Sequence, residues 1–442
     1  MKRIIIENFG PIKKIDVPLN KELNIVIGPQ ASGKSTLGKA IYFCRKIRDY
    51  LSDYASQIIN SDENHNELYI NFLKFIRQPF MGCFGTTKHM NPFLIKYYYD
   101  YKASQYVEIT LDNDHYAKFA FSSDMANNIR NLIHEAVEIS RNNINNNFTA
   151  LYFKQISFLE NFKQQTYKIF SDDEMLLYIP AGRNLLATLP DLIPTKISIS
   201  SPEHFSEIDI SQMDLPTQEF ISYIRHMRST FGSRLEEITQ TYLKTVKGQI
   251  RNQDVELACK LIRNILRADY VCDKDGEKLF YDKSHWVKLM FASSGQQEIL
   301  WALNIIFLSI LKNEKTFLVF EEPESHLFPD AQESIAKLVA LMINSNKSEV
   351  LITTHSPYIL TAFNMLIFSG KVEKGSTTKN KVVVDKHYRL MPDSVSAYLL
   401  SASEGTLKDL ISPKRGLIDA LEIDKISEEI NRNMNTLLKM SL

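Results

Sequence analysis

Residues 28–35 constrain this 442-residue chain most strongly, because they read Gly-Pro-Gln-Ala-Ser-Gly-Lys-Ser. They match the pattern G-x-x-x-x-G-K-[ST], whose glycines let successive backbone N–H groups turn toward phosphate oxygens. The lysine brings a positive charge to the β- and γ-phosphates, and the next hydroxyl is a ligand for Mg²⁺. An apolar run precedes the motif at residues 23–27, and a helical apolar pattern follows it from Ser35. The sequence therefore predicts a strand, a phosphate-binding loop and a helix whose positive end faces the phosphates.

A second motif follows an apolar run at residues 317–320, where Glu321 and Glu322 precede Pro323. The run is typical of a buried parallel strand, and ligands bind at the carboxyl ends of such strands. One carboxylate can hold Mg²⁺, through water, and the other can orient or deprotonate the attacking water. A solvated Glu-Glu turn is the common alternative. Downstream of a phosphate loop, we favour the metal and base interpretation.

A third motif, Ser293-Ser294-Gly295-Gln296-Gln297, opens a long apolar helical segment. Ser294 and Gln297 have the spacing of a capping box. The same exposed helix start can also bind a phosphate, and the two interpretations are compatible. A fourth candidate is His355, just after the predicted strand at 350–353, where an imidazole can hydrogen-bond a γ-phosphate or the attacking water. A lone histidine is more often structural.

The remaining sequence alternates between strand-like and helix-like patterns. Residues 106–121 read as a β-hairpin with its turn at 112–115, and residues 270–291 as a short antiparallel set. The tail has one predicted strand, at 381–384, and then helices. We expect an α/β fold with a mixed sheet flanked by helices and an inserted helical lobe.

The order of these motifs resembles the ATP-binding-cassette (ABC) P-loop ATPase head, and more closely its RecF/SMC/OLD-like branch. Residues 6–12 resemble the first hairpin of that branch. Residues 321–327, Glu-Glu-Pro-Glu-Ser-His-Leu, resemble the OLD-like Walker B segment, and residues 354–357 resemble its switch-histidine segment. The resemblance covers about residues 1–50 and 175–370.

The resemblance implies ATP and Mg²⁺ as cofactors, and a homodimer or higher oligomer in which two protomers sandwich ATP. Glu322 would be the catalytic base, His355 would sense the γ-phosphate, and Ser294 and Gly295 would form the signature that contacts the ATP of a second protomer. Arg183 follows a strand where the Q-loop glutamine is expected and would replace it. The implied nucleotide-binding residues are Gly28, Pro29, Gln30, Ala31, Ser32, Gly33, Lys34, Ser35, Thr36, Ser294, Gly295 and Arg183; the implied metal ligands are Ser35 and Glu321; the implied catalytic residues are Glu322, His355 and Lys34.

The same resemblance suggests how the chain is divided. The predicted parts are an ATPase lobe with the phosphate loop and β-hairpins (1–123), a helical insert (124–174), a return to the ATPase core (175–200), a helical lobe (201–268), the signature, Walker B and switch-histidine part (269–370), and a basic strand with helices (371–442).

The signature reads Ser-Ser-Gly-Gln-Gln, the metal carboxylate is Glu321 rather than aspartate, and Phe328 precedes Pro329 where an aspartate is usual. These departures favour the OLD-like branch over a transporter ATPase subunit. The tail has no Asp-x-Asp of a Toprim nuclease, so we expect any nuclease effector to be a separate chain. Stand-alone ATPases of this kind resemble components of antiphage systems such as Septu or PARIS. The alternative is a RecF/SMC-like ATPase that binds DNA directly in repair or recombination.

Composition agrees with a globular protein and leaves the partners open. Lys and Arg total 52 and Asp and Glu total 52, so the net charge is zero, which excludes a histone-like polycation. Four scattered cysteines and the absence of a long apolar tract predict a soluble cytoplasmic protein. Residues 370–389 carry six lysines and arginines. This segment could contact a nucleic acid backbone, and the alternative is a solvated basic face or loop.

Overall fold

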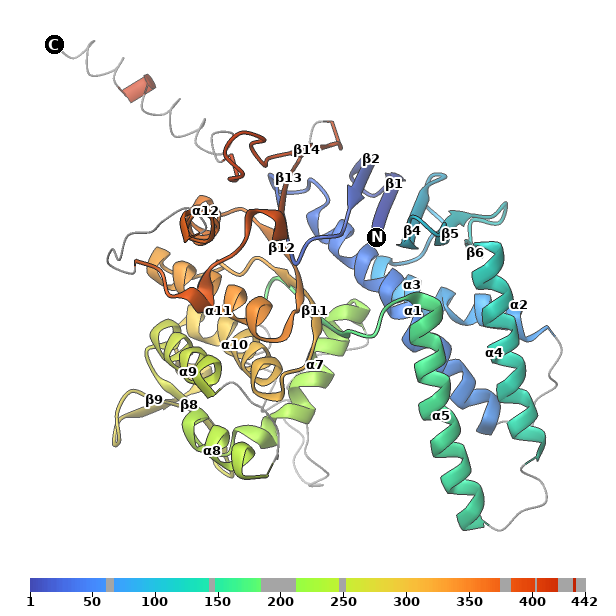
Figure 1. Cartoon of the computed structure of the whole chain (residues 1–442), viewed down its shortest axis with the longest axis horizontal. Coiled ribbons are helices and arrows are strands. Elements are labelled where there is room, and N and C mark those ends of the chain that lie inside the picture. Colours follow the sequence, from blue (N-terminus) through green and yellow to red (C-terminus); the bar gives the residue numbers. More distant parts are fainter. Residues whose placement is uncertain are drawn as a thin grey trace, which may run out of the picture.

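The computed structural model describes residues 1–60, 67–142, 148–183, 212–245, 252–373, 383–401, 404–419 and 432–434. Two large β-sheets with a long helix between them form the centre of the molecule, and further helices cover the outer sides (Figure 1). The predicted α/β class, with a mixed sheet flanked by helices and a helical lobe, is confirmed.

The six-stranded sheet has the order β14-β13-β3-β12-β11-β7, in which only β14 is antiparallel to its neighbour. Every residue of β3 and β11 is buried, as expected for central parallel strands covered on both faces. The strands are β3 (Leu23–Ile27), β7 (Met175–Ile179), β11 (Thr316–Glu321), β12 (Glu349–Thr354), β13 (Val395–Leu400) and β14 (Leu407–Asp409).

The second sheet is antiparallel, with the order β2-β1-β4-β5-β6. The predicted hairpin is confirmed, because β5 pairs with β6 around the turn at 112–115. Buried and exposed residues alternate along β2 and β6, so one face of this sheet packs inward and the other does not. The strands are β1 (Arg3–Phe9), β2 (Ile12–Pro18), β4 (Leu94–Asp100), β5 (Gln105–Leu111) and β6 (Ala117–Phe121).

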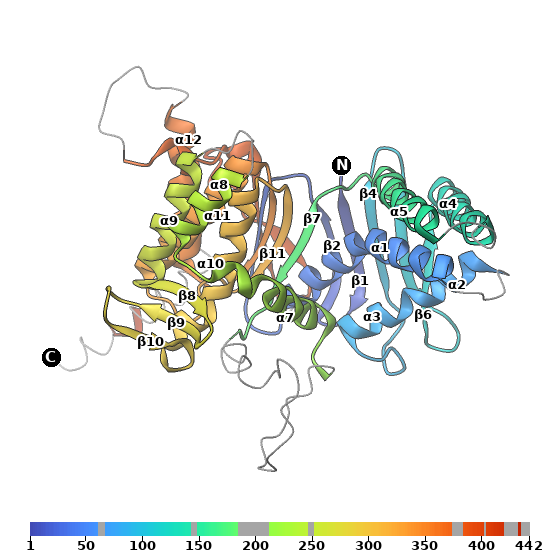
Figure 2. The same ribbon diagram turned by 90° about the horizontal axis from the view of Figure 1, so that it is seen from below.

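Helix α1 (Lys34–Asn60) runs between the two sheets and contacts both (Figure 2). The antiparallel sheet, α1, α4 and α5 share one hydrophobic core, while the other face of the six-stranded sheet shares a second core with α9 to α12. The other helices are α2 (Leu68–Phe75), α3 (Arg77–Phe84), α4 (Ser123–Asn142), α5 (Phe148–Phe170), α7 (Leu215–Met227), α8 (Leu235–Thr245), α9 (Asn252–Leu266), α10 (Ser294–Lys312), α11 (Pro329–Asn346) and α12 (Pro357–Glu373).

The tail differs from the prediction. The expected strand at 381–384 lies partly outside the described residues, and Val383 and Val384 form a bend rather than a strand. Two short 3₁₀ helices (Lys386–Tyr388 and Pro392–Ser394) come next, and residues 432–434 are helical. Between them lies an unpredicted strand, β13, which pairs in parallel with β3, the strand that leads into the phosphate loop. Sequence reasoning missed β13 because its pairing is with a strand more than 350 residues earlier, which no local pattern reveals.

The predicted antiparallel set at 270–291 is confirmed as a three-stranded sheet of order β10-β9-β8. Its strands are β8 (Asp269–Asp273), β9 (Gly276–Phe280) and β10 (Trp286–Lys288). Within the described ranges, none of the helices has the length and apolar character needed to cross a bilayer.

Candidate functional site

Three neighbouring strands bring the predicted motifs to one edge of the six-stranded sheet. Ile27 at the end of β3 lies opposite Thr354 at the end of β12, and Glu321 at the end of β11 lies opposite Thr353. Because these strands are parallel, the segments that follow them leave the sheet on the same side. The phosphate loop, the Glu321-Glu322 pair and His355 are therefore gathered at this edge, although they are separated by hundreds of residues in sequence.

The phosphate loop has little room for side chains at its glycines. A Cβ on Gly28 would lie 2.4 Å from the backbone oxygen of Leu400, so a larger residue would force the loop away from β13. Gly33 has φ +102°, a conformation that L side chains rarely adopt, and a Cβ there would meet Ile12. Ser35 is exposed at the start of α1, where its hydroxyl can reach a bound metal. These observations explain why the motif needs glycine at both ends.

The Lys34 side chain is held inside the loop. Its Nζ donates to the backbone oxygens of Gly28 and Pro29, both at 2.9 Å, and the residue is only 6% exposed. Burial lowers the pKa of Lys34, and the nearby carboxylates of Glu322, Glu324 and Glu321 act in the opposite direction. The lysine of the first motif and the glutamates of the second thus lie within electrostatic reach of each other.

The two glutamates at the end of β11 have different environments. Glu321 is 3% exposed, and its Oε2 accepts a hydrogen bond of 3.0 Å from the Ala181 N–H. Its Oε1 accepts no hydrogen bond from the described residues. The hydroxyl of Tyr178 lies nearby, and its pKa is raised first by burial and then by the negative charge of Glu321. Glu322 has φ +43° and points its carboxylate to a partly exposed position. That left-handed backbone costs about 1–3 kcal/mol and is typical of functional sites.

His355 lies next to Glu322, with Nε2 3.4 Å from Oε1 of that carboxylate. Glu324 orients the histidine segment, since its Oε1 accepts from the backbone N–H of His355 at 2.6 Å and from the Thr354 hydroxyl at 2.8 Å. The structure therefore brings the predicted base and sensor together. It also identifies Glu324 as a positioning residue, a role that its place in the Glu-Glu-Pro-Glu motif did not by itself reveal.

Arg183 does not extend toward the phosphate loop. Its guanidinium is 1% exposed and donates to the backbone oxygens of Pro180, Glu321 and Glu322 and of Glu298 in α10. These bonds occupy the donors that a replacement for a Q-loop glutamine would offer to a nucleotide. The prediction that Arg183 replaces the Q-loop glutamine at the nucleotide is therefore not supported by this conformation. The tertiary fold directs the side chain inward, to backbone carbonyl groups.

The start of α10 is capped one residue earlier than predicted. Ser293, rather than Ser294, is the N-cap, and it forms a reciprocal capping box with Gln296 rather than Gln297. Ser294 is thereby free of the capping role and is exposed at the first helical position. The Gln297 amide instead donates to three backbone oxygens, those of Leu289, Met290 and Ala292, and so fixes the approach to the helix.

An open pocket of about 600 Å³ lies beside the start of α10. Ser293, Gly295 and Gln296 line one side, and residues that follow the Walker B segment line another. Phe328, which lines this pocket, is 77% exposed, and Phe291, three residues before the first residue of α10, is 72% exposed. Exposed apolar side chains beside a pocket mark surfaces that other molecules cover.

The C-terminal β13–β14 hairpin braces the phosphate loop. Leu400 contacts Gly28 directly, and the Gly405 oxygen accepts hydrogen bonds from the N–H groups of Lys13 and Lys14. The start of β2, which contains Lys13, packs Ile12 against Gly33 of the phosphate loop. The loop is thus held by segments from both ends of the chain.

We expect Gly405→Ala to raise the KM for ATP severalfold, whereas Gly416→Ala leaves it unchanged. Both glycines have φ near +60°, so both variants lose roughly 1 kcal/mol of stability from backbone strain. Only at Gly405 would the new Cβ clash with the Lys13 nitrogen, at 2.7 Å, and push the start of β2 against the phosphate loop. Steady-state ATPase assays at matched folded fractions test this expectation, and equal KM values for the two variants would contradict it.

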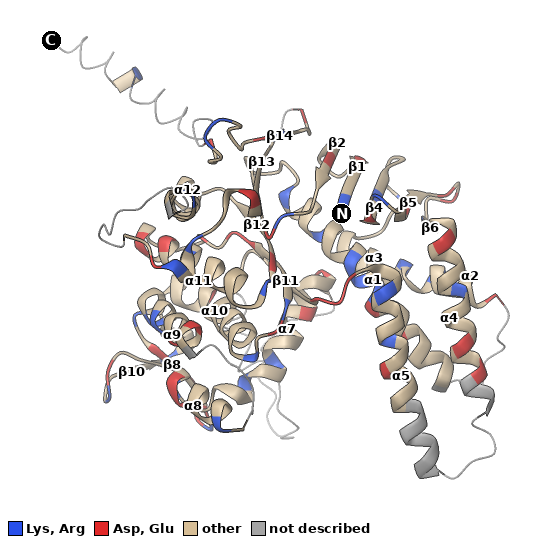
Figure 3. Cartoon of the chain, viewed as in Figure 1, with Lys and Arg blue, Asp and Glu red and all other residues tan. Residues whose placement is uncertain are grey.

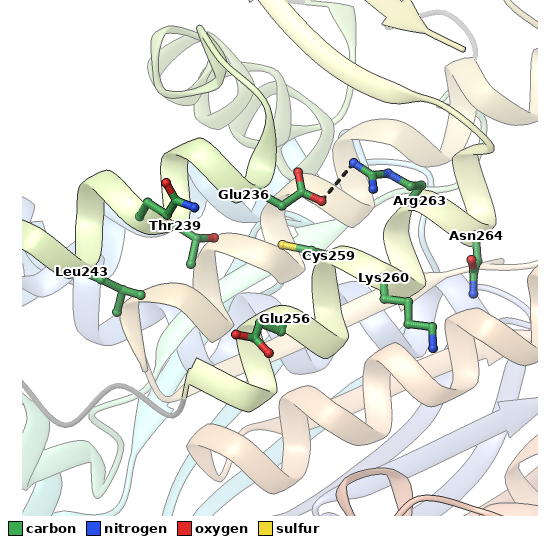
Figure 4. Close-up of a pocket in the computed structure, with 9 residues that line it drawn as sticks. Glu236, Thr239, Leu243, Glu256, Cys259, Lys260, Arg263 and Asn264 are labelled. Atoms are coloured by element: carbon green, nitrogen blue, oxygen red, sulfur yellow. Dashed lines mark ion pairs between the residues drawn. The ribbon is translucent and has the colours of Figure 1, made fainter. Parts of the chain in front are cut away.

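Other pockets lie elsewhere in the described parts of the molecule. One of about 370 Å³ is formed between α8 and α9, with an ion pair of 2.9 Å between Glu236 and Arg263 at its rim (Figure 4). Another, of about 770 Å³, lies between α1, α3 and the start of α7. Neither is lined by the phosphate loop, by Glu321 and Glu322, or by His355. We therefore place the candidate active site at the sheet edge.

Positive and negative side chains are interspersed over the described elements (Figure 3). Of the basic segment predicted at 370–389, Lys374, Lys379 and Lys381 lie outside the described residues. Two described cations are directed to backbone oxygens: Lys371 donates to Arg415 and Arg389 donates to Val384. The described part of this segment thus offers fewer cations to a polyanion than its composition suggested.

The residues at the sheet edge have the chemistry needed to bind Mg²⁺ and a nucleoside triphosphate. Two oxygens there are buried or nearly so and accept no hydrogen bond from the described residues, namely Ser32 Oγ and Glu321 Oε1. The exposed Ser35 hydroxyl and the Glu321 carboxylate are oxygen ligands of the kind that Mg²⁺ prefers. The glycine-lined loop at the N-terminus of α1 supplies the N–H groups that phosphates require.

Comparison with known proteins identifies the family of the chain. A family model described as "AAA ATPase domain" matches residues 1–360. The DNA replication and repair protein RecF of Proteus mirabilis (strain HI4320) is 36% identical over 64 residues, 14% of this chain and 18% of that protein. RecF of Aliivibrio fischeri (strain ATCC 700601 / ES114) is 37% identical over 71 residues, 16% and 19% respectively. The chain thus spans less than a fifth of the length of these two curated relatives.

Two solved structures are similar over longer stretches. The Smc head bound to the C-winged helix domain of ScpA has a TM-score of 0.40 at 12% identity, covering 92% of this chain and 95% of that one. The Smc head with an extended coiled coil bound to the C-terminal domain of ScpA derived from Pyrococcus furiosus has a TM-score of 0.38 at 12% identity, covering 98% and 100%. Because the family model spans most of the chain and includes the phosphate loop, both glutamates and His355, the protein belongs to the AAA ATPase domain family and is a P-loop ATPase distantly related to RecF.

Proposed function

We propose that this P-loop ATPase hydrolyses ATP to ADP and phosphate with Mg²⁺, as a head-to-tail dimer that sandwiches ATP and gates a partner effector. The observation that supports hydrolysis best is the meeting of Lys34, Glu322 and His355 at the ends of three adjacent parallel strands. A nucleotide-binding protein without hydrolysis would need the lysine but not a partly exposed carboxylate paired with a histidine.

The chain's own groups can perform each part of the reaction. Lys34 would exchange its bonds to the Gly28 and Pro29 oxygens for the β- and γ-phosphates. Mg²⁺, held by Ser35 and Glu321, would neutralise charge on the phosphate oxygens. Glu322 would accept a proton from the attacking water. The water oxygen would bond to the γ-phosphorus while the bond between this phosphorus and the bridging oxygen of ADP breaks. His355, 3.4 Å from Glu322, would hydrogen-bond the γ-phosphate.

The surface around α10 supports the dimer. Ser294 is exposed at the first position of a helix of 19 residues, where backbone N–H groups are available to an anion. The open pocket beside it and the exposed Phe328 and Phe291 would be covered by a second copy of the chain. The signature would then complete the site formed around Lys34 of the other protomer.

Mixing two inactive variants tests the dimer. Lys34→Ala removes the phosphate charge, and Ser294→Arg fills the helix start of the exposed signature. Each homodimer should be inactive, while an equimolar mixture should recover measurable turnover of at most about a quarter of the wild-type value, because half of the randomly paired dimers contain one intact composite site of two. The readout is phosphate release. If the mixture stays inactive although both variants fold and pair, the signature does not act in trans.

A partner effector, a nuclease of an antiphage defence system, is the finer part of the proposal. It is supported by the OLD-like form of the Walker B segment and by the resemblance to stand-alone ATPases of such systems. Co-purification of the full chain with the product of a neighbouring gene, with and without ATP, tests it. Recovery of the ATPase alone under both conditions would count against a gated effector.

A second candidate function is direct DNA binding in repair or recombination, which the matches to RecF favour. This function predicts affinity for DNA that falls steeply with salt, since each neutralised phosphate releases a counterion. A binding titration at several salt concentrations distinguishes the two functions. Salt-independent or absent binding would leave the effector-gating proposal.

A further inference from the structure

Arg183 joins three segments that are distant in sequence. From its place after β7, the guanidinium donates to Pro180 O at 2.7 Å, to Glu321 O at 2.6 Å and to Glu322 O at 3.0 Å. Its Nε donates to the Glu298 backbone oxygen in α10 at 3.1 Å, and its Nη2 lies 3.7 Å from the Glu298 carboxylate. A planar guanidinium can satisfy so many acceptors at fixed angles, and a lysine ammonium cannot.

The backbone of Glu322 is held by β12 and by Arg183. Its left-handed conformation is held from one side by its own N–H, which donates to Thr353 O at 2.8 Å. It is held from the other side by Arg183, which donates to its carbonyl. Arg183 therefore helps to fix the direction of the Glu322 side chain without touching the substrate.

Glu298 connects the same arginine to the start of α10. It lies in the second turn of α10, four residues after Ser294, and is 2% exposed. Its Oε2 accepts no hydrogen bond from the described residues, and His326 Nε2 lies 3.5 Å away. A Cβ on Gly295 would lie only 2.5 Å from the His326 oxygen, so the helix start also packs tightly on the segment that follows Glu322.

The charges agree with a coupled unit. Burial lowers the pKa of Arg183, and Glu298 is the largest of the carboxylates that oppose this, followed by Glu321 and Glu322. Arg183 is therefore a buried cation that contacts both the signature helix, at Glu298, and the Walker B glutamates, at their backbone oxygens. A displacement of the helix start would change its bonds to Glu322.

We propose that Arg183 is a positioning residue that links occupancy of the signature to Glu322, so that a second protomer's ATP on α10 sets the base for hydrolysis in the first. This inference rests on the proposed ATP-sandwiched dimer. It assigns a regulatory role to Arg183 and Glu298. Binding of ATP at one composite site of the dimer prepares hydrolysis at the other composite site. The expected signature is cooperative dependence of turnover on ATP.

The test uses the full chain and the variants Arg183→Lys and Glu298→Gln. We expect Arg183→Lys to lower kcat by about 10²-fold, as for a misplaced catalytic group. ATP affinity, measured with a fluorescent ATP analogue, should stay near the wild-type value, and cooperativity should be lost. Glu298→Gln should produce a smaller loss of the same kind. The double variant should fall no further than Arg183→Lys, because the two residues act along one path.

Arg48→Lys is the matched control, because Arg48 is also a buried arginine that donates to a backbone oxygen, that of Glu174. We expect it to lower thermal stability while kcat and cooperativity remain. If Arg183→Lys folds with unchanged kcat and cooperativity, the inference is wrong. Equal loss of kcat in Arg48→Lys, or additive losses in the double variant, would also overturn it. If Arg183→Lys does not fold, Glu298→Gln decides by the same two readouts.

These outcomes are separate from failure of the proposed function. A wild-type chain that does not hydrolyse ATP, or a Glu322→Gln variant with normal turnover, would contradict the ATPase mechanism itself. A wild-type chain that is active, is arrested by Glu322→Gln and is indifferent to Arg183→Lys would contradict only the link through Arg183.

Discussion

Glu322→Gln should slow ATP hydrolysis by roughly 10²–10⁴-fold while ATP binding persists. The amide has the size of the carboxylate and keeps its place beside His355 and the Ser325 hydroxyl, but it cannot accept the proton of the attacking water. The lysine, the glycine-lined loop and Glu321 are untouched, so the nucleotide is still held. Phosphate release and equilibrium binding of ATP, measured on the same preparation, separate the two effects.

The trapped nucleotide should also stabilise the sandwiched dimer, which size-exclusion chromatography with ATP can detect. Glu333→Gln is the matched control, because Glu333 lies on α11 and pairs with Lys337 at 2.7 Å, outside the candidate site. Its turnover should equal that of the wild-type chain. Normal turnover in Glu322→Gln itself would remove the assignment of this residue as the base.

Arg45→Met should destabilise the fold by about 3–5 kcal/mol, the usual cost of breaking a buried ion pair from one side. Arg45 is 1% exposed and binds both oxygens of Asp172 at 2.7 Å, Glu174 at 2.5 Å and Glu349 at 2.8 Å. Methionine fills similar volume but leaves three carboxylates around an apolar side chain. Denaturant unfolding gives the change in the free energy of unfolding.

Arg3→Met is the control for the chemical change alone. Arg3 pairs with Asp16 on the sheet surface, where both side chains are partly exposed, so we expect a loss of no more than about 1 kcal/mol. If both variants lose the same stability, the buried cluster around Arg45 contributes no more than a surface pair. Such a result would contradict the prediction.

Asp172 makes this cluster sensitive to acid. Burial opposes ionisation and is the largest single influence, but Arg45, Lys2 and Arg48 together outweigh it and lower the pKa of Asp172 to about 2 from an ordinary value of 3.8. A depressed folded-state pKa contributes stability above pH 3.8, and that contribution, about 2 kcal/mol, is lost as the pH falls toward 2. Between these pH values, the free energy of unfolding of the wild-type chain should therefore fall more steeply with decreasing pH than that of Arg45→Met.

Local sequence patterns were sufficient wherever a motif and its flanking strand or helix are contiguous. The phosphate loop, the apolar strand before Glu321 and the hairpin at 106–121 lie where they were predicted, because each depends on short-range turn chemistry and periodicity. Patterns were weaker where two local solutions compete. Ser293 and Ser294 both have a glutamine three residues later, and the structure shows that Ser293 is the cap.

The identities and order of residues 28–36, 321–322 and 355 by themselves determined the class of chemistry, because a phosphate loop and an acidic strand end need particular side chains at fixed local spacings. Only the tertiary structure decided which groups hold them in place. The carbonyl groups that receive Arg183 come from β7, β11 and α10, and the brace on Gly28 comes from Leu400 near the other end of the chain. Such contacts arise from the parallel order of strands and from buried polar groups that must find partners, and neither is written in any local stretch of sequence.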